Sequence, residues 1–195
     1  MFGFSRLKDA KQKKFQAKLQ EAALKIIEAL NTDIDYLMFF EGKRRLDVLA
    51  DAYFVRYLFG MFDAVTFFMV SPELRLKIGK KFIAAYYLTY LVQEFGLEPS
   101  QALRIFHSVW RFYNSDEGER DDAIGDGGTD GLSILRGQNP RRLMKHFGVI
   151  ADDEKTDAHL SRWEAFCSRD RWSENAIREG QRIMQAVIDG VIALD

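Results

Sequence analysis

The chain has a single cysteine, Cys167, and only three prolines among its 195 residues. A lone cysteine excludes an intramolecular disulfide bond and a zinc site built from several thiolates. One free thiol also fits a reducing compartment, and no signal peptide is recognisable at the basic start of the sequence, so we expect a cytoplasmic protein. Without disulfides, the fold must be stabilised by an ordinary apolar core.

The sequence also lacks a long apolar run and a large excess of positive or negative charge. The longest nearly apolar stretch, residues 57–70, is interrupted by Asp63 and is shorter than the ~20 residues that span a bilayer. We therefore expect this stretch to be a core helix. The formal net charge is −1, whereas nucleic-acid-binding domains usually carry a strongly basic face, so we expect no nucleic-acid partner.

Aromatic residues are abundant, with 16 Phe, 7 Tyr and 3 Trp. Such side chains bury large areas, so they indicate either a thick core or a core together with one exposed apolar patch. Apolar residues recur three and four positions apart along most of the chain, and strict alternation is absent. These patterns predict an all-α protein, a single-domain helical bundle over residues 1–195 with about four long and three or four short helices.

Capping residues, prolines and glycines locate the expected helix boundaries. Ser71 and the proline after it separate two long helices, and Gly96 is suited to end the second of them. Helices are expected at residues 15–30, 44–70, 72–95, 101–113, 140–146, 159–167 and 173–193, with a short turn at 34–41 after a cap at 31–33.

The first 13 residues are lysine-rich and precede the first apolar stripe. A basic helix lying on a membrane would separate its lysines from its apolar face. On a helical wheel, however, Lys8 falls on the same side as Ile26. We therefore expect residues 1–13 to be a solvated basic arm, and peripheral membrane contact through this segment is the less favoured alternative.

Two charged residues interrupt the apolar helix predicted over residues 44–70. Arg56 and Asp63 are seven positions apart, or two helical turns, on one face. Charges in an apolar setting are costly unless they are paired, so we expect a buried ion pair that Arg45 is close enough to join. The alternative is a polar pocket for an anionic or amide-bearing ligand.

Residues 115–138 are predicted to form a long, acidic, glycine-rich loop. The part over 115–131 holds seven acidic residues, one basic residue and five glycines. Loops of this length are usually functional or disordered. The candidate ligand- or partner-binding residues of the chain are Arg56, Asp63, Asp121, Asp122, Asp126 and Asp130.

Three interpretations of this loop remain open: a solvated loop, a partner-docking loop and a divalent-metal site. Aspartates are suited to bind calcium or magnesium, but their spacing does not match an EF-hand. Nearby arginines are available to neutralise the aspartates without a metal. These arginines are Arg111, Arg120 and Arg136.

No set of residues has the spacing of a catalytic site. His107, His146 and His159 belong to separate predicted helices without a metal-binding spacing. Asp47 and Asp51 are four residues apart, as in helices that bind magnesium and diphosphate, but no second acidic motif accompanies them. We expect this pair to face solvent, and we name no catalytic residue.

The sequence therefore predicts a non-enzymatic helical interaction module, an assembly subunit or adaptor that needs no cofactor. Its partner is expected to be another protein or a second copy of the chain. The first alternative is a divalent-metal-dependent hydrolase or transferase that uses the carboxylates of the acidic loop. A small-ligand-binding helical bundle centred on Arg56 is the third hypothesis.

Overall fold

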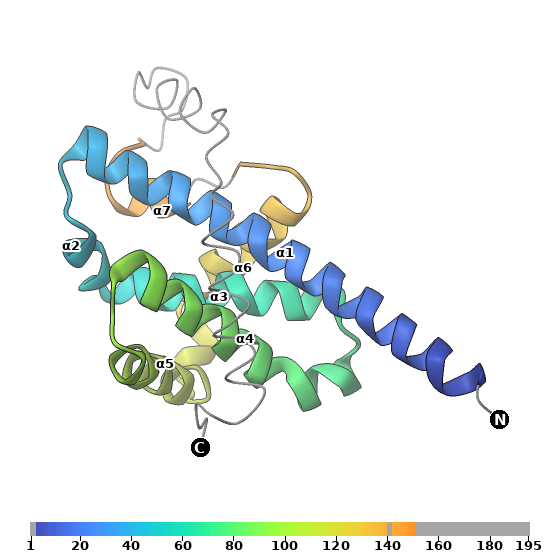
Figure 1. Cartoon of the computed structure of the whole chain (residues 1–195). Coiled ribbons are helices and arrows are strands. Elements are labelled where there is room, and N and C mark those ends of the chain that lie inside the picture. The colour runs from blue at the N-terminus through green and yellow to red at the C-terminus, as the bar shows by residue number, and fades with distance from the viewer. Residues whose placement is uncertain (1–2, 140–141, 151–195) are drawn as a thin grey trace.

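The computed structural model describes residues 3–139 and 142–150, and these residues form helices without any β-strand (Figure 1). The all-α prediction is confirmed for this part of the chain. In order, the elements are α1 (Gly3–Glu41), α2 (Arg45–Leu49), α3 (Ala52–Met69), α4 (Pro72–Phe95), α5 (Pro99–Tyr113), the 3-10 helix η1 (Gly118–Arg120), α6 (Asp122–Leu135) and α7 (Arg142–His146). The helices predicted at 159–167 and 173–193, together with His159 and Cys167, lie outside the described residues.

Helix α1 extends beyond the predicted boundaries at both ends. The expected arm is helical from Gly3 onward, and the first turns of α1 project past the other helices in Figure 1. The expected cap at residues 31–33 does not end the helix, because the apolar stripe continues through Ile34 and Leu37, which are fully buried. Here packing outweighs the local preference of Asn, Thr and Asp for a helix terminus.

The single helix predicted over residues 44–70 is divided into α2 and α3. The break falls at Asp51, whose backbone is extended and whose carboxylate accepts hydrogen bonds from the amides of Tyr53 (2.8 Å) and Phe54 (3.2 Å). This is the geometry of a helix N-cap. Asp51 therefore begins α3 and does not share a helix face with Asp47, which contacts Arg44.

Helix α3 is the centre of the fold, packed against α1, α4, α5 and α6. The aromatic residues concentrate around it. The Phe59 ring, for example, lies 4.9 Å from Tyr113 and 6.0 Å from Trp110, measured between ring centres. Within the described residues, α3 is the one helix that is long and apolar enough to cross a membrane, but 56% of it is buried inside the protein. As predicted, it is a core helix.

The boundaries of α4 and α5 agree well with those predicted. Helix α4 begins at Pro72 and ends before Gly96, whose φ of 65° lies in the left-handed region that glycine tolerates. Helix α5 begins at Pro99, two residues earlier than expected, and ends at Tyr113. The short helix α7 ends at His146 as expected.

The prediction of a long loop over residues 115–138 is wrong for most of its length. After a short link through η1, residues 122–135 form helix α6, which packs directly on α3. A Cβ atom added to Gly127 would lie 2.0 Å from the carbonyl oxygen of Tyr57. One added to Gly60, on α3, would lie 2.2 Å from the carbonyl oxygen of Ile124. These glycines permit the two backbones to touch, and this packing offsets the weak helix propensity of glycine.

Candidate functional site

The ion pair predicted between Arg56 and Asp63 is absent. Seven residues of helix separate two side chains by about 10 Å along the axis, which is too far for a direct contact. Arg56 instead donates from Nη1 to Oδ2 of Asp121, at 2.9 Å. Its guanidinium group also lies over the ring of Phe112, 4.1 Å from the ring centre. Arg56 therefore joins α3 to the region where α5 ends and α6 begins.

Asp63 binds a different arginine, Arg75 of α4. The Nη2 atom of Arg75 lies 2.8 Å from each carboxylate oxygen of Asp63. The hydroxyl group of Tyr113 donates to the same carboxylate at 3.3 Å. Arg45, which we expected near this pair, instead contacts Glu94 at 2.9 Å. Both predicted site residues on α3 thus act as links between helices.

The four aspartates of residues 121–130 occupy three different environments. Asp121 is the N-cap of α6, where its Oδ1 accepts a hydrogen bond from the amide of Ile124 at 3.0 Å. Asp122 is exposed in the first turn of the helix. Asp126 and Asp130 lie one helical turn apart and both contact Arg142 of α7. The arginines that neutralise these aspartates therefore come from α3 and α7.

Asp126 and Asp130 form a polar network with two tyrosines of α3. The hydroxyl groups of Tyr53 and Tyr57 donate to Asp126 and Asp130 respectively, each at 2.8 Å. Arg142 donates from Nε to Asp126 at 3.1 Å. It also donates to Asp130 from its side chain and, at 3.1 Å, from its backbone amide. The network therefore joins α3, α6 and α7 through hydrogen bonds.

Burial governs the ionisation of this network. Asp130 is 1% exposed, and burial raises the pKa of its carboxyl group although the hydrogen bonds from Tyr57 and Arg142 oppose the shift. Burial also raises the pKa of the Tyr57 hydroxyl well above its ordinary value, and the charge of Asp130 adds to that shift. Tyr57 therefore remains a neutral hydrogen-bond donor.

His146 extends the network towards the surface. Its Nε2 atom lies 3.0 Å from Oδ2 of Asp51, and its ring stacks on Tyr53 with 3.8 Å between ring centres. A His–Asp pair activates catalysis when a nucleophile is within hydrogen-bond reach of the histidine. The Tyr53 hydroxyl instead donates to Asp126, so the arrangement orients a histidine without activating that tyrosine.

The predicted site residues did not include Tyr53, Tyr57 or Arg142, and His146 was considered only as a metal ligand. The sequence contains one signal of this network: the two tyrosines are four residues apart, and so are Asp126 and Asp130. Matched spacing on two helices allows two parallel side-chain contacts. The partners are 73 residues apart in the chain, so the spacing alone does not identify them.

Three of the four candidate aspartates for a metal site are occupied by protein donors. Asp121, Asp126 and Asp130 each accept hydrogen bonds through both carboxylate oxygens or pair with arginine. Within residues 3–139 and 142–150, no group of three or more His, Cys, Asp or Glu side chains is arranged to hold a metal ion.

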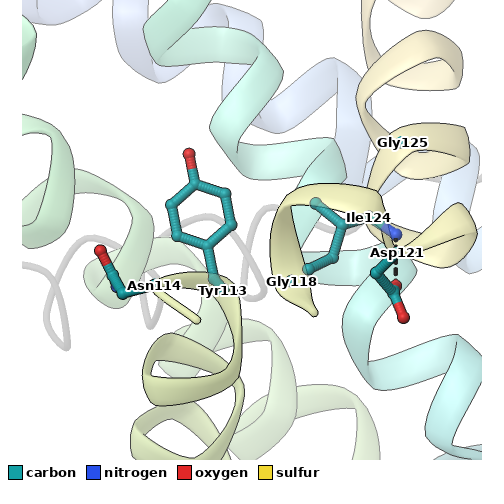
Figure 2. A pocket seen from close by; sticks show the side chains of 6 residues that line it. All are labelled: Tyr113, Asn114, Gly118, Asp121, Ile124 and Gly125. Carbon is teal, nitrogen blue, oxygen red and sulfur yellow. Dashed lines mark hydrogen bonds between the residues drawn. The ribbon is translucent and has the colours of Figure 1, made fainter. Parts of the chain in front are cut away.

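A pocket of about 640 Å³ lies where the end of α5 meets the start of α6 (Figure 2). The side chains of Tyr113 and Ile124 line it from opposite sides in Figure 2. Its lining residues are Tyr113, Asn114, Gly118, Asp121, Ile124 and Gly125. A Cβ atom added to Gly125 would meet nothing within 4 Å, so open space borders the α6 backbone at this position.

A second surface feature is an exposed apolar corner between α3 and α4. It consists of Phe67, Phe68, Leu74 and Leu76, which are 65%, 51%, 37% and 90% exposed. We call these four residues the α3–α4 corner. Exposed large apolar side chains at the end of one helix and the start of the next favour a surface that binds a partner.

No protein-family model matches this chain, and neither a curated protein nor a solved structure matches it. The features of the molecule that bear on its function are the pocket, the polar network and the α3–α4 corner.

Proposed function

We propose that the protein is a non-enzymatic helical interaction module, a subunit or adaptor that binds its partner through the α3–α4 corner. The observation that carries this proposal is the exposure of four large apolar side chains beside a core that buries Phe54, Phe59 and Phe62 completely. Burying a Leu or Phe side chain fully is worth about 1.5–3 kcal/mol. Burial of these side chains by a partner would therefore stabilise the complex.

The state of the aspartates also favours this function over a metal-dependent hydrolase or transferase. Metal-dependent catalysis needs carboxylates from several elements that converge on an open site. Asp126 and Asp130 lie on one helix and are held by Tyr53, Tyr57 and Arg142. Their geometry supports a role in holding α6 against α3.

Photocrosslinking in native cells tests the proposed function. A benzophenone amino acid replaces Leu76 in the corner and, as a matched control, the exposed Arg120 in η1. We expect a discrete adduct, with a protein or with lipid, from position 76 and not from position 120. Equal labelling at both positions, or no adduct at position 76, would contradict the proposal.

A second candidate function, a small-ligand-binding helical bundle, is favoured by one observation in the pocket. Glycine inside a helix costs about 0.5–1 kcal/mol relative to alanine. Packing explains that cost at Gly127 but not at Gly125, which borders open space. A ligand that approaches the α6 backbone between Tyr113 and Ile124 would explain it.

Nuclear magnetic resonance with benzamide as a probe tests this second candidate. Benzamide offers a flat ring for the space between Tyr113 and Ile124 together with an amide group. We expect shifts at the pocket residues, which Gly125→Leu should abolish. Gly128→Ala is the matched control, because Gly128 lies on the same helix but does not line the pocket. Shifts that persist in Gly125→Leu would reject the site.

A further inference from the structure

The α3–α4 corner combines its apolar side chains with positive charge. Residues 67–81 contain one acidic residue, Glu73, and four basic residues. Two of the basic residues have partners: Arg75 binds Asp63, and Lys80 lies 5.5 Å from the centre of the Trp110 ring. The other two are Lys77 and Lys81.

Lys77 and Lys81 are exposed, and no ion pair holds either of them within the part of the chain that the structure describes. They are four residues apart on α4, so both lie on one side of the helix. Amphipathic helices bury their apolar face about 5–10 Å deep in a membrane interface, with basic residues at the headgroups. Lys77 directly follows Leu76 and comes three residues after Leu74, so basic and apolar side chains are neighbours at the start of α4.

Helix α1 contributes further positive charge. Lys14 and Lys18 are exposed on its solvent side. In Figure 1 the projecting start of α1 and the turn between α3 and α4 lie towards the same end of the molecule. Exposed positive charge is therefore present on both α1 and α4.

We infer that the α3–α4 corner docks on an anionic lipid surface, with its Phe and Leu side chains inserted and Lys77 and Lys81 at the headgroups. This inference rests on the proposed function of the corner. The exposed positive charge of Lys77 and Lys81 beside exposed apolar side chains matches a surface that is both apolar and anionic, as anionic lipid is. The stems of the two lysines can also lie along apolar surface while their charges stay in water.

Vesicle flotation with the full chain tests the inference. The probes are vesicles of phosphatidylcholine alone and of phosphatidylcholine mixed with phosphatidylserine. We expect the protein to float with the mixed vesicles, to bind the neutral ones much more weakly, and to dissociate as salt is raised, because anionic lipids attract basic residues electrostatically.

Two variants separate the apolar and charged contributions. Combining Phe68→Ser with Leu76→Ser should weaken binding by at least about tenfold, because two inserted side chains are lost. Combining Lys77→Gln with Lys81→Gln should remove most of the preference for phosphatidylserine. The control is Phe39→Ser, which removes an apolar side chain that is 72% exposed on α1, outside the corner, and should leave binding unchanged. Unchanged circular dichroism verifies that each variant is folded.

The outcomes separate this inference from the proposed function. A protein adduct at position 76 without vesicle binding would reject the lipid partner and leave the interaction module in place. Equal binding to neutral and anionic vesicles, or full binding by the Phe68→Ser, Leu76→Ser variant, would also overturn the inference. Absence of both adduct and vesicle binding would reject both proposals.

Discussion

Helix α3 meets its neighbours in opposite ways at its two ends. Along its first half, α6 approaches so closely that Gly60 and Gly127 have no room for a Cβ atom, and Tyr53 and Tyr57 find acceptors on α6. In its last turn, Phe67 and Phe68 face solvent. Helix α3 therefore combines close packing along its first half with exposed apolar side chains in its last turn.

This contrast also reverses the roles that the sequence suggested. The acidic segment was the expected place for function, but Asp126 and Asp130 connect helices. The aromatic residues were expected either in a thick core or in a core with one exposed apolar patch, and Phe67 and Phe68 lie on the surface. Buried polar groups with partners specify how helices pack, whereas exposed apolar groups are available to a partner.

The largest expected effect is at the contact between α3 and α6. Gly127→Ala should destabilise the protein by about 3 kcal/mol or more, because the new Cβ atom would meet backbone atoms that cannot move independently. Gly125→Ala, on the same helix, should stabilise it by about 0.5–1 kcal/mol. Chemical denaturation measures both changes. Similar effects of the two substitutions would contradict the close contact between the helices.

The next largest effect is at Asp130. Asp130→Ala should cost about 2–4 kcal/mol, because it leaves the buried Tyr57 hydroxyl without an acceptor and creates a cavity. Adding Tyr57→Phe should recover about 1 kcal/mol by removing the stranded hydroxyl. The exposed Asp122→Ala serves as control and should change the unfolding free energy by less than about 0.5 kcal/mol. Additive losses in the double variant would argue against the hydrogen bond.

A smaller effect is expected at Asp51. Burial raises the pKa of its carboxyl group, but the hydrogen bond from His146 and those from the amides of Phe54 and Tyr53 outweigh it, so the net shift is downward. The ionised carboxylate therefore stabilises the fold above its unfolded pKa, and this stabilisation is lost as pH falls through the lower folded pKa.

Asp51→Asn tests the contribution of the ionised carboxylate to stability, because asparagine caps a helix about as well as aspartate. We expect a loss of about 1 kcal/mol at neutral pH, typical of a partly exposed charged contact. The loss should shrink as the pH falls through the folded pKa of Asp51, where the native side chain also becomes neutral. Denaturation curves over a range of pH measure the difference. A loss that persists unchanged at pH values well below the folded pKa of Asp51 would contradict the assignment.

At the α3–α4 corner, substitutions should barely alter stability. Leu76 is 90% exposed, so Leu76→Lys should change the unfolding free energy by less than about 0.5 kcal/mol. A thermal melt of this variant is sufficient to measure the effect. Destabilisation comparable to that of Asp130→Ala would mean that Leu76 supports the fold.

The smallest effect is expected from divalent cations. Millimolar calcium or magnesium should leave the melting temperature unchanged, because Asp121, Asp126 and Asp130 already have protein donors. A site with ligand at about 100 times Kd would add about 2.7 kcal/mol. A clear rise that disappears when Asp126 and Asp130 are replaced by Asn would favour the metal-dependent alternative.

Local signals were sufficient to predict part of the fold. Pro72, Gly96 and Pro99 marked the ends of α4 and the start of α5 because their backbone constraints act within a single turn. The helix over residues 122–135 was missed because its glycines are stabilised by contact with α3, about 70 residues away in the chain. Contacts of this range are not encoded in local propensity.

The candidate site was less predictable than the fold. Arg56 and Asp63 were recognised as charges that needed partners, and each has one, but the partners are Asp121 and Arg75. Which helix faces each charge depends on tertiary packing. The exposed corner was predicted only as a general excess of aromatic residues, because composition does not indicate which of them face solvent.

Native-state hydrogen exchange tests the central claim most directly, namely that the acidic, glycine-rich segment is a packed structural helix. Amides buried by cooperative packing exchange only through large-scale unfolding, whereas loop amides exchange quickly. We predict that the amides of residues 126–135 in α6 are protected to the same degree as those of α3. Rapid exchange across residues 126–135 while α3 remains protected would contradict the account.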